Sequence, residues 1–431
     1  MFSSHRSHAA VPAAVLVLTA FFALMVCTLP AAADEVDDDA SVEAVVREVF
    51  GLKHVTFGGR LFCDWMEWGS VDSSLETAFG EDEFVGGTEF RTARVQMAGE
   101  VSDRIGFFVD YDFSGGEAKL KDAYMEYRRI EHLGNIRIGH IREPFGLEGL
   151  TSSKYTTFME PALTSAYYPW RNTGLMLHNT VADDVVTWQA GIFRDADATG
   201  AGRGEDEFSY TARLASEAWR SEDGRRIVHL GASYSHRNPG DEIARFKSAS
   251  ENHLGPVLAD TGELQAHGVS LLGFEIAAGF GPVLLQGEYV KASVDQVEGT
   301  PWLGDPVRGG SSADFSGYYV QVSWLMTGET HPFSKGAPGR IKPRSPLGDG
   351  GRGAFELAVR YSGLDLTDTS AHIEFGELSN TTVGLNWYTS ANSRIMLNYV
   401  ISDYMGPDAE ERGEDIEGST SALLTRFQID F

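Results

Sequence analysis

The last nine residues, 423–431, alternate strictly between apolar and polar side chains. The two sets lie on opposite faces of an extended strand, with Phe427, Ile429 and Phe431 on one face and Arg426, Gln428 and Asp430 on the other. Alternation that ends in a terminal aromatic residue is typical of the closing strand of an outer-membrane β-barrel, apolar toward lipid and polar toward the lumen. A strand of a soluble sandwich also alternates, so the barrel interpretation requires the pattern to recur along the chain.

The same pattern recurs in short segments rich in aromatic residues and glycine. In 393–402, for example, Tyr399 and Ile401 share one face, and Met396 and Asn398 lie opposite. The predicted strands are 55–64, 90–98, 105–113, 121–130, 135–141, 173–180, 185–193, 208–215, 227–235, 267–278, 281–291, 316–326, 353–362, 379–388, 393–402 and 423–431. The chain is therefore predicted to be all-β, a transmembrane antiparallel β-barrel of about 16 strands.

The predicted connections alternate in length, as in barrels with short periplasmic turns and long external loops. Most turns after even-numbered strands are short, which places both termini in the periplasm. Long connections follow odd-numbered strands, at 65–89, 142–172, 236–266, 292–315 and 403–422. Two segments depart from this rule: 114–120 is short where a loop is expected, and the Gly- and Pro-rich 327–352 is long where a turn is expected.

The N-terminus has the features of a secretory signal peptide. Arg6 is the only formal charge before Asp34, and an apolar run leads into the small-residue cleavage site Ala31-Ala32-Ala33. The run is interrupted by threonine and is shorter than a typical spanning helix, so we predict cleavage rather than anchoring. We divide the chain into a signal peptide, a short periplasmic leader with helical valine spacing, and the barrel domain: 1–33, 34–54 and 55–431.

Composition and motifs exclude several other classes of protein. The formal net charge of -27 disfavours nucleic-acid binding. A hydrophobic fraction of 42% with 48 glycines is too low for a bundle of membrane helices. The chain contains no G-x-S-x-G, H-E-x-x-H or P-loop motif, and its histidines lack metal spacing, so no enzymatic activity, cofactor or metal is predicted. A lipid-modifying barrel enzyme with Ser and His on adjacent strands would leave no such motif and stays open as an alternative.

An ordered set of short motifs resembles the phosphate-selective porin family of the O/P type. The resemblance covers nearly all of 55–431. It is carried by Gly58-Gly59-Arg60, Phe90-Arg91-Thr92-Ala93-Arg94, Lys121-Asp122-Ala123-Tyr124, Arg142-Glu143-Pro144-Phe145-Gly146, Asn172-Thr173-Gly174 and Gly384-Leu385-Asn386-Trp387-Tyr388.

The resemblance implies a homotrimer of sixteen-stranded barrels in outer-membrane lipid, each with its own anion channel. It also implies that loop 142–172 folds inward as a constriction. The positions that match channel-lining or anion-binding residues of the family are Arg60, Arg91, Lys154 and Asp122, with Arg213 and Arg237 in stretches that resemble segments with lumen arginines. Asp122 is expected to organise arginines by hydrogen bonding rather than to contact the ion.

The function implied is that of an outer-membrane porin, a passive channel for small anions such as phosphate or related oxyanions. Rings of arginine and lysine at a narrow point favour anions, and guanidinium groups suit phosphate oxygens. One departure weakens a phosphate preference, because Thr92 stands where the family has a second arginine. Strict alternation puts Arg94 on the face opposite Arg91, so Arg94 is not expected to replace it.

Two alternatives remain at this stage. Arg60 and Arg91 could pair with lumen carboxylates such as Asp122 and only support the wall. The whole chain could also be a structural or adhesive barrel, with a lumen occluded by loop 142–172 and acidic surface loops that bind a partner or divalent cations.

Overall fold

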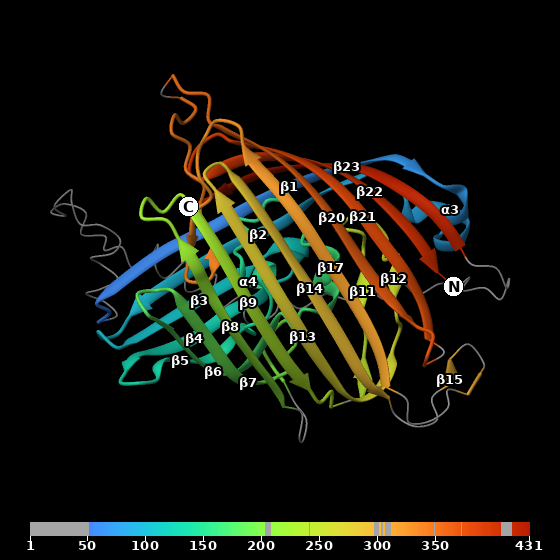
Figure 1. The fold of residues 1–431 in the computed structure, drawn as a ribbon, viewed down its shortest axis with the longest axis horizontal. Coiled ribbons are helices and arrows are strands. Elements are labelled where there is room, and N and C mark those ends of the chain that lie inside the picture. The colour runs from blue at the N-terminus through green and yellow to red at the C-terminus, as the bar shows by residue number, and fades with distance from the viewer. Residues whose placement is uncertain are drawn as a thin grey trace, which may run out of the picture.

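The computed structural model describes residues 51–202, 208–240, 242–296, 301–302, 305–306, 312–348, 350–371, 373–406 and 416–431. Within these residues sixteen antiparallel strands form a closed barrel, in which each strand pairs with the next and β23 pairs with β1 (Figure 1). The strands are β1 (His54–Val71), β2 (Gly87–Glu100), β3 (Ile105–Asp112), β4 (Lys119–Ile130), β5 (Gly134–Arg142), β6 (Arg171–Val181), β7 (Val186–Arg194), β8 (Ser209–Arg220), β9 (Arg226–Arg237), β13 (Leu264–Phe280), β14 (Val283–Gln296), β17 (Ser312–Leu325), β20 (Ala354–Asp368), β21 (Ile373–Tyr388), β22 (Ser393–Gly406) and β23 (Ile416–Asp430). The predicted all-β barrel is confirmed.

Short elements occupy the connections. They are α3 (Ser73–Phe79), η1 (Glu81–Glu83), η2 (Ser114–Gly116), α4 (Leu147–Leu150), η3 (Leu163–Tyr167), β10 (Ile243–Ala244), β11 (Lys247–Ser248), β12 (Ala259–Asp260), β15 (Pro301–Trp302), β16 (Asp305–Pro306), β18 (Phe333–Ser334) and β19 (Ala337–Pro338). None of the helices in the described part of the chain is long and apolar enough to cross a membrane. The predicted signal peptide and nearly all of the leader lie outside the described residues.

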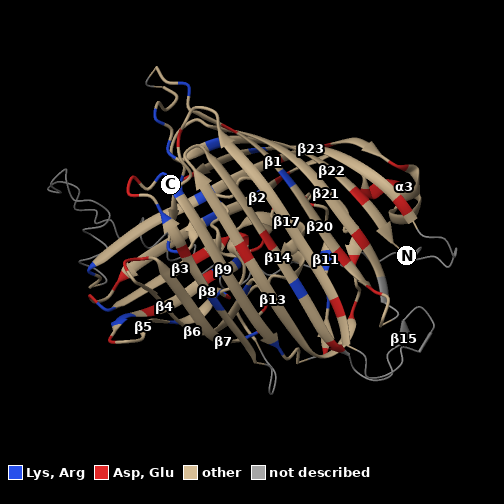
Figure 2. Ribbon diagram, viewed as in Figure 1, with Lys and Arg blue, Asp and Glu red and all other residues tan. Residues whose placement is uncertain are grey.

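Alternation in the strands separates an apolar outer face from a polar inner face. In β23, Phe427 and Ile429 are 53% and 51% exposed on the outside, whereas Arg426 and Gln428 are 2% and 5% exposed. An arginine facing lipid at mid-membrane would cost roughly 2–4 kcal/mol, which fixes the register of the strand. Figure 2 shows acidic and basic residues along the strands and at the barrel ends, within a wall that is mostly uncharged.

Several strands extend further than the sequence pattern predicted. β23 begins at Ile416 rather than residue 423, and β1 continues to Val71. The additional residues of β23 include Glu417, Gly418 and Ser419. Polar residues and glycine on both faces carry no period-2 signal, so the predicted strands stopped where the apolar band stops. The external connections are correspondingly shorter than predicted.

Two connections fill one side of the barrel interior. They are loop 143–170, between β5 and β6, and loop 238–263, between β9 and β13. Tyr167 of the first and Phe246 of the second pack against each other and against apolar residues of β14, β17 and β20, with a ring-centroid distance of 5.1 Å between them. An apolar core excludes water, and the two cavities described below lie mainly along the opposite wall, from β1 to β8.

The connection 326–353 explains why a long segment stands where a short turn was expected. Arg213 of β8 donates a hydrogen bond to the Gly336 carbonyl at 2.9 Å, and Arg220 donates one to the Phe333 carbonyl at 2.9 Å. The Phe333 ring lies 4.9 Å from the ring of His229. Residues 333–336 of this segment therefore pack on side chains of β8 and β9, whereas a later part of the segment projects beyond the end of the barrel (Figure 1).

Candidate functional site

Basic side chains surround the part of the lumen that the loops leave open. A cavity of about 380 Å³, here called the outer cavity, lies between loop 143–170 and the wall. Its basic lining residues are Arg91, Arg94, Lys121, Arg142, Arg171 and Arg426. Its acidic lining residues are Glu148, Glu160 and Asp197.

A second cavity of about 310 Å³, here called the inner cavity, adjoins the first and shares two lining residues with it. Its basic lining residues are Arg60, Arg137, Arg142, Arg171, Arg213 and Lys335, and its acidic ones are Asp110 and Asp122. Arg142 and Arg171 line both cavities, so guanidinium groups join one cavity to the next. Anions passing along this wall would meet basic groups in succession, an arrangement that favours anions over cations.

Glu160 attaches loop 143–170 to the wall through two arginines. Arg91 Nε and Nη2 donate to Glu160 Oε1 and Oε2 at 2.9 Å each, and Arg426 Nη2 donates to Oε1 at 2.7 Å. Burial by itself would raise the pKa of Glu160, but the charges of Arg91 and Arg426 outweigh it and lower the pKa to about 2. Glu160 is therefore ionised at neutral pH, and it neutralises part of the charge of both arginines.

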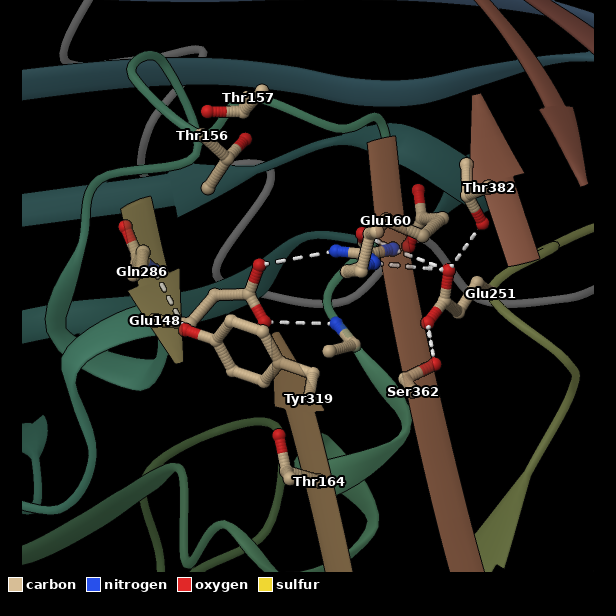
Figure 3. Close-up of polar contacts among 12 residues, drawn as sticks. Glu148, Thr156, Thr157, Glu160, Thr164, Glu251, Gln286, Tyr319, Ser362 and Thr382 are labelled. Atoms are coloured by element: carbon tan, nitrogen blue, oxygen red, sulfur yellow. Dashed lines mark hydrogen bonds and ion pairs between the residues drawn. The ribbon is translucent and has the colours of Figure 1, made fainter. Parts of the chain in front are cut away.

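Arg360 of β20 forms a second attachment, on the filled side of the barrel. Its guanidinium donates to Glu148 Oε1 at 3.3 Å, to Glu251 Oε2 at 3.1 Å and to the Glu160 carbonyl at 3.0 Å. Figure 3 shows Glu251, which belongs to loop 238–263, joined also to Ser362 and Thr382. One buried arginine therefore links the wall to both loops.

Arg60 and Asp122, both predicted site residues, lie at the inner cavity. Arg60 Nη1 donates to the Ser153 hydroxyl of loop 143–170 at 3.0 Å, and Nη2 donates to Gln96 Oε1 at 3.3 Å. Asp122 Oδ2 accepts hydrogen bonds from Arg171 Nε and Nη2 at 3.0 and 2.9 Å. The carboxylate of Asp122 thus holds an arginine that faces both cavities.

The other predicted residues lie in different surroundings. Arg213 lines the inner cavity but is paired with Glu275, which accepts from its Nε at 3.0 Å. Arg237 pairs with Glu143 at 2.9 Å and also with Asp195, and it lines neither cavity.

Lys154 of loop 143–170 lines neither of the two cavities. Its Nζ is 5.7 Å from the Tyr155 ring centroid, and it lines a small recess with Arg340 and Asp430. Burial and the nearby charge of Arg60 lower the pKa of Lys154 below its usual value. The structure thus brings Arg60, Asp122 and Arg213 together, places Arg91 at the adjoining cavity, and keeps Lys154 and Arg237 apart from both.

The prediction that Arg94 faces away from Arg91 is wrong. The β1–β2 register shifts between Phe62, which is opposite Thr92, and Cys63, which is opposite Phe90, so Arg91 is the extra residue of a β-bulge. The bulge breaks strict alternation, and both arginines line the outer cavity. Arg94 Nε also donates to Asp112 Oδ2 at 2.9 Å.

Sequence reasoning missed several basic residues of the two cavities. Alternation places Arg426 on the polar face of the last strand, but nothing in the sequence marks it as a channel residue. Arg142 and Arg171 sit at the ends of β5 and β6, where alternation gives little guidance. Lys335 has no strand signal at all, because it belongs to the connection 326–353.

Comparisons with known proteins agree with this architecture. An uncharacterised protein of Caulobacter vibrioides is 26% identical over 352 residues, which cover 80% of this chain and 68% of that relative. Porin O of Pseudomonas aeruginosa is 24% identical over 349 residues, 72% of this chain and 75% of that protein. The anion-selective porin from Comamonas acidovorans shares the fold with a TM-score of 0.51 at 13% identity, over 88% of this chain and 99% of that one.

The profile of the family described as phosphate-selective porin O and P matches residues 73–431, which is most of the chain and every barrel strand after β1. The protein therefore belongs to the phosphate-selective porin O and P family.

Proposed function

We propose that this outer-membrane porin conducts small anions by passive diffusion, with phosphate or related oxyanions among them. The observation that carries the proposal is the continuity of basic side chains, since Arg142 and Arg171 line both cavities. Arg142 donates to the carbonyl oxygens of Gly149 and Thr151 and forms no ion pair with an acidic side chain of the described residues. No carboxylate is bonded directly to this guanidinium, so its charge is available to attract a passing anion.

Weak binding spread over several positions suits conduction. An oxyanion can pass from one arginine of the two cavities to the next, so no single site holds it long enough to stop transport. Arg91 pairs with Glu160 and Arg171 pairs with Asp122, and these carboxylates weaken the attraction of the two arginines for a passing anion. We propose no enzymatic activity or cofactor.

Trimer formation is part of the proposal. β3, β5 and β7 have only eight or nine residues, whereas β13 has 17. A strand needs about 9–11 residues to cross the membrane, so the wall at β3–β7 is marginal in height. Packing that wall against other copies would shield it from lipid. Cross-linking in detergent and light scattering of the purified protein test this assembly.

Export by a cleaved signal peptide at 1–33, and a leader at 34–54, are also proposed. Mass measurement of the protein from outer membranes would show an N-terminus near residue 34. An N-terminus retained at Met1 would contradict cleavage.

Reversal potentials in planar bilayers test the channel proposal itself. Under a potassium chloride gradient we expect a potential of the sign given by chloride permeation, and phosphate added to chloride should reduce the current. Cation selectivity would refute the anion part. Absence of channels would favour the alternative of a structural or adhesive barrel with an occluded lumen.

A further inference from the structure

Asp110 lies between two arginines without a hydrogen bond to either. Arg60 and Arg94 are opposite each other in the β1–β2 pair, and Asp110 is opposite Gln96 in the β2–β3 pair. Asp110 Oδ2 is 3.8 Å from Arg60 Nη2 and 3.6 Å from Arg94 Nη1. Both distances exceed those of a direct hydrogen bond, about 2.7–3.2 Å. Asp110 therefore attracts both arginines, while the direct hydrogen bonds that it could accept from them are not formed.

Unsatisfied polar atoms are concentrated at this place. Asp110 Oδ1, Arg94 Nη1 and Arg60 Nε are buried and have no hydrogen-bond partner among the described residues. Asp110 is only 1% exposed, yet it lines the inner cavity together with Arg60. Buried polar atoms are rarely left unpaired, so a cluster of one free acceptor and two free donors points to a ligand that both accepts and donates.

We propose that Asp110 selects oxyanions that carry a proton. The carboxylate accepts the O–H of a hydrogen phosphate ion, while Arg60 and Arg94 donate to its other oxygens. This inference rests on the proposed anion channel and names the substrate class of that channel. Inorganic phosphate carries at least one O–H at neutral pH, and sulfate of the same tetrahedral shape carries none. Sulfate would meet the same arginines, but it has no O–H to donate to the Asp110 carboxylate. The negative charge of that carboxylate would therefore repel it.

Asp112 provides a matched control. It lies two residues away on the same inner face of β3, so neutralising either aspartate removes one negative charge from nearly the same place. Its oxygens are already occupied, because they accept from Ala93 N and Ser114 N at 3.1 Å and from Arg94 Nε at 2.9 Å. Asp110→Asn and Asp112→Asn therefore differ in hydrogen-bonding capacity and not in net charge.

The experiment compares phosphate and sulfate in planar bilayers at neutral pH. Wild-type protein and both variants are measured for the concentration of each anion that halves the chloride current, and for reversal potentials in potassium chloride. We expect wild type to respond to phosphate at lower concentration than to sulfate. Asp110→Asn should reduce the preference for phosphate over sulfate on the order of tenfold, which is the effect of losing one hydrogen bond to a charged group. Asp112→Asn should retain the preference.

Other outcomes refute the inference. Equal responses to phosphate and sulfate in an anion-selective wild type would overturn it and leave the channel proposal standing, even if neither variant folds. A preference lost equally in both variants, or kept in both, would show that Asp110 acts only as a counter-ion. Cation selectivity in potassium chloride would remove the proposed function and this inference together.

Discussion

Arg91 of β2 binds both carboxylate oxygens of Glu160, with two nitrogen–oxygen distances of 2.9 Å. A bidentate pair of this kind fixes the direction of both side chains as well as their separation. It therefore ties loop 143–170 to the wall at the outer cavity. Since the pKa of Glu160 is about 2, the attachment persists across the neutral and mildly acidic range.

Arg91→Ala and Glu160→Gln should shift ion selectivity in opposite directions. The first removes a positive charge from the outer cavity and leaves Glu160 to Arg426, whereas the second removes the negative charge and frees Arg91. Each should change the anion-to-cation permeability ratio by about fivefold, the effect of one unit charge at close range in water. Reversal potentials measure the ratio, and the double variant should return it toward wild type. A change of the same sign in both single variants would contradict this account.

Arg360→Met should lower the free energy of unfolding by about 3–5 kcal/mol, because it leaves the buried Glu148 and Glu251 without their cation. Unfolding of the detergent-solubilised barrel, followed by tryptophan fluorescence, measures this value. Arg245→Ala is the control, since Arg245 also pairs with an aspartate, Asp260, but its side chain is 45% exposed. The control should change stability far less. Equal losses in the two variants would disprove the role of Arg360 as the common attachment of both loops.

Lys154 lines neither cavity, but its charge interacts with that of Arg60 at the inner cavity, so anion selectivity should decline at alkaline pH partly through Lys154. A lysine is charged below its pKa, and burial lowers the pKa of Lys154, so it loses its charge as pH rises before an ordinary lysine does. Lys154→Arg keeps the charge at every pH in this range. Reversal potentials from neutral to alkaline pH should therefore fall more in wild type than in this variant. Superimposable curves would exclude Lys154 from the conducting path.

The β-bulge at Arg91 makes a prediction about side-chain direction. In a Cys63→Ser background, a cysteine substituted at Arg94 should react with a charged, water-soluble thiol reagent that enters the lumen, and the reaction should lower the current. A cysteine substituted at Val95, which is exposed on the outer face, should be protected by lipid or detergent. The reverse pattern would mean that β2 alternates without the bulge.

Alternation was sufficient to predict the barrel because it is a local property. Phe427 and Arg426 take opposite faces through the geometry of an extended chain alone, and the cost of an arginine in lipid decides which face is outside. The same reasoning failed at Arg94, since one inserted residue changes the face of all that follow it. Recognising the bulge requires the register with β1, which residues 87–100 do not contain by themselves.

The sequence alone determined the antiparallel barrel wall, its polarity and most of the alternation between short and long connections. Only the tertiary structure decided which basic residues border open space. That choice depends on contacts distant in sequence, which fix the position of two loops within the lumen. Arg91 with Glu160 and Arg360 with Glu251 are examples. The physical reason is that a strand's pattern records which side faces water, while the water-filled path is whatever volume the packed loops leave unfilled.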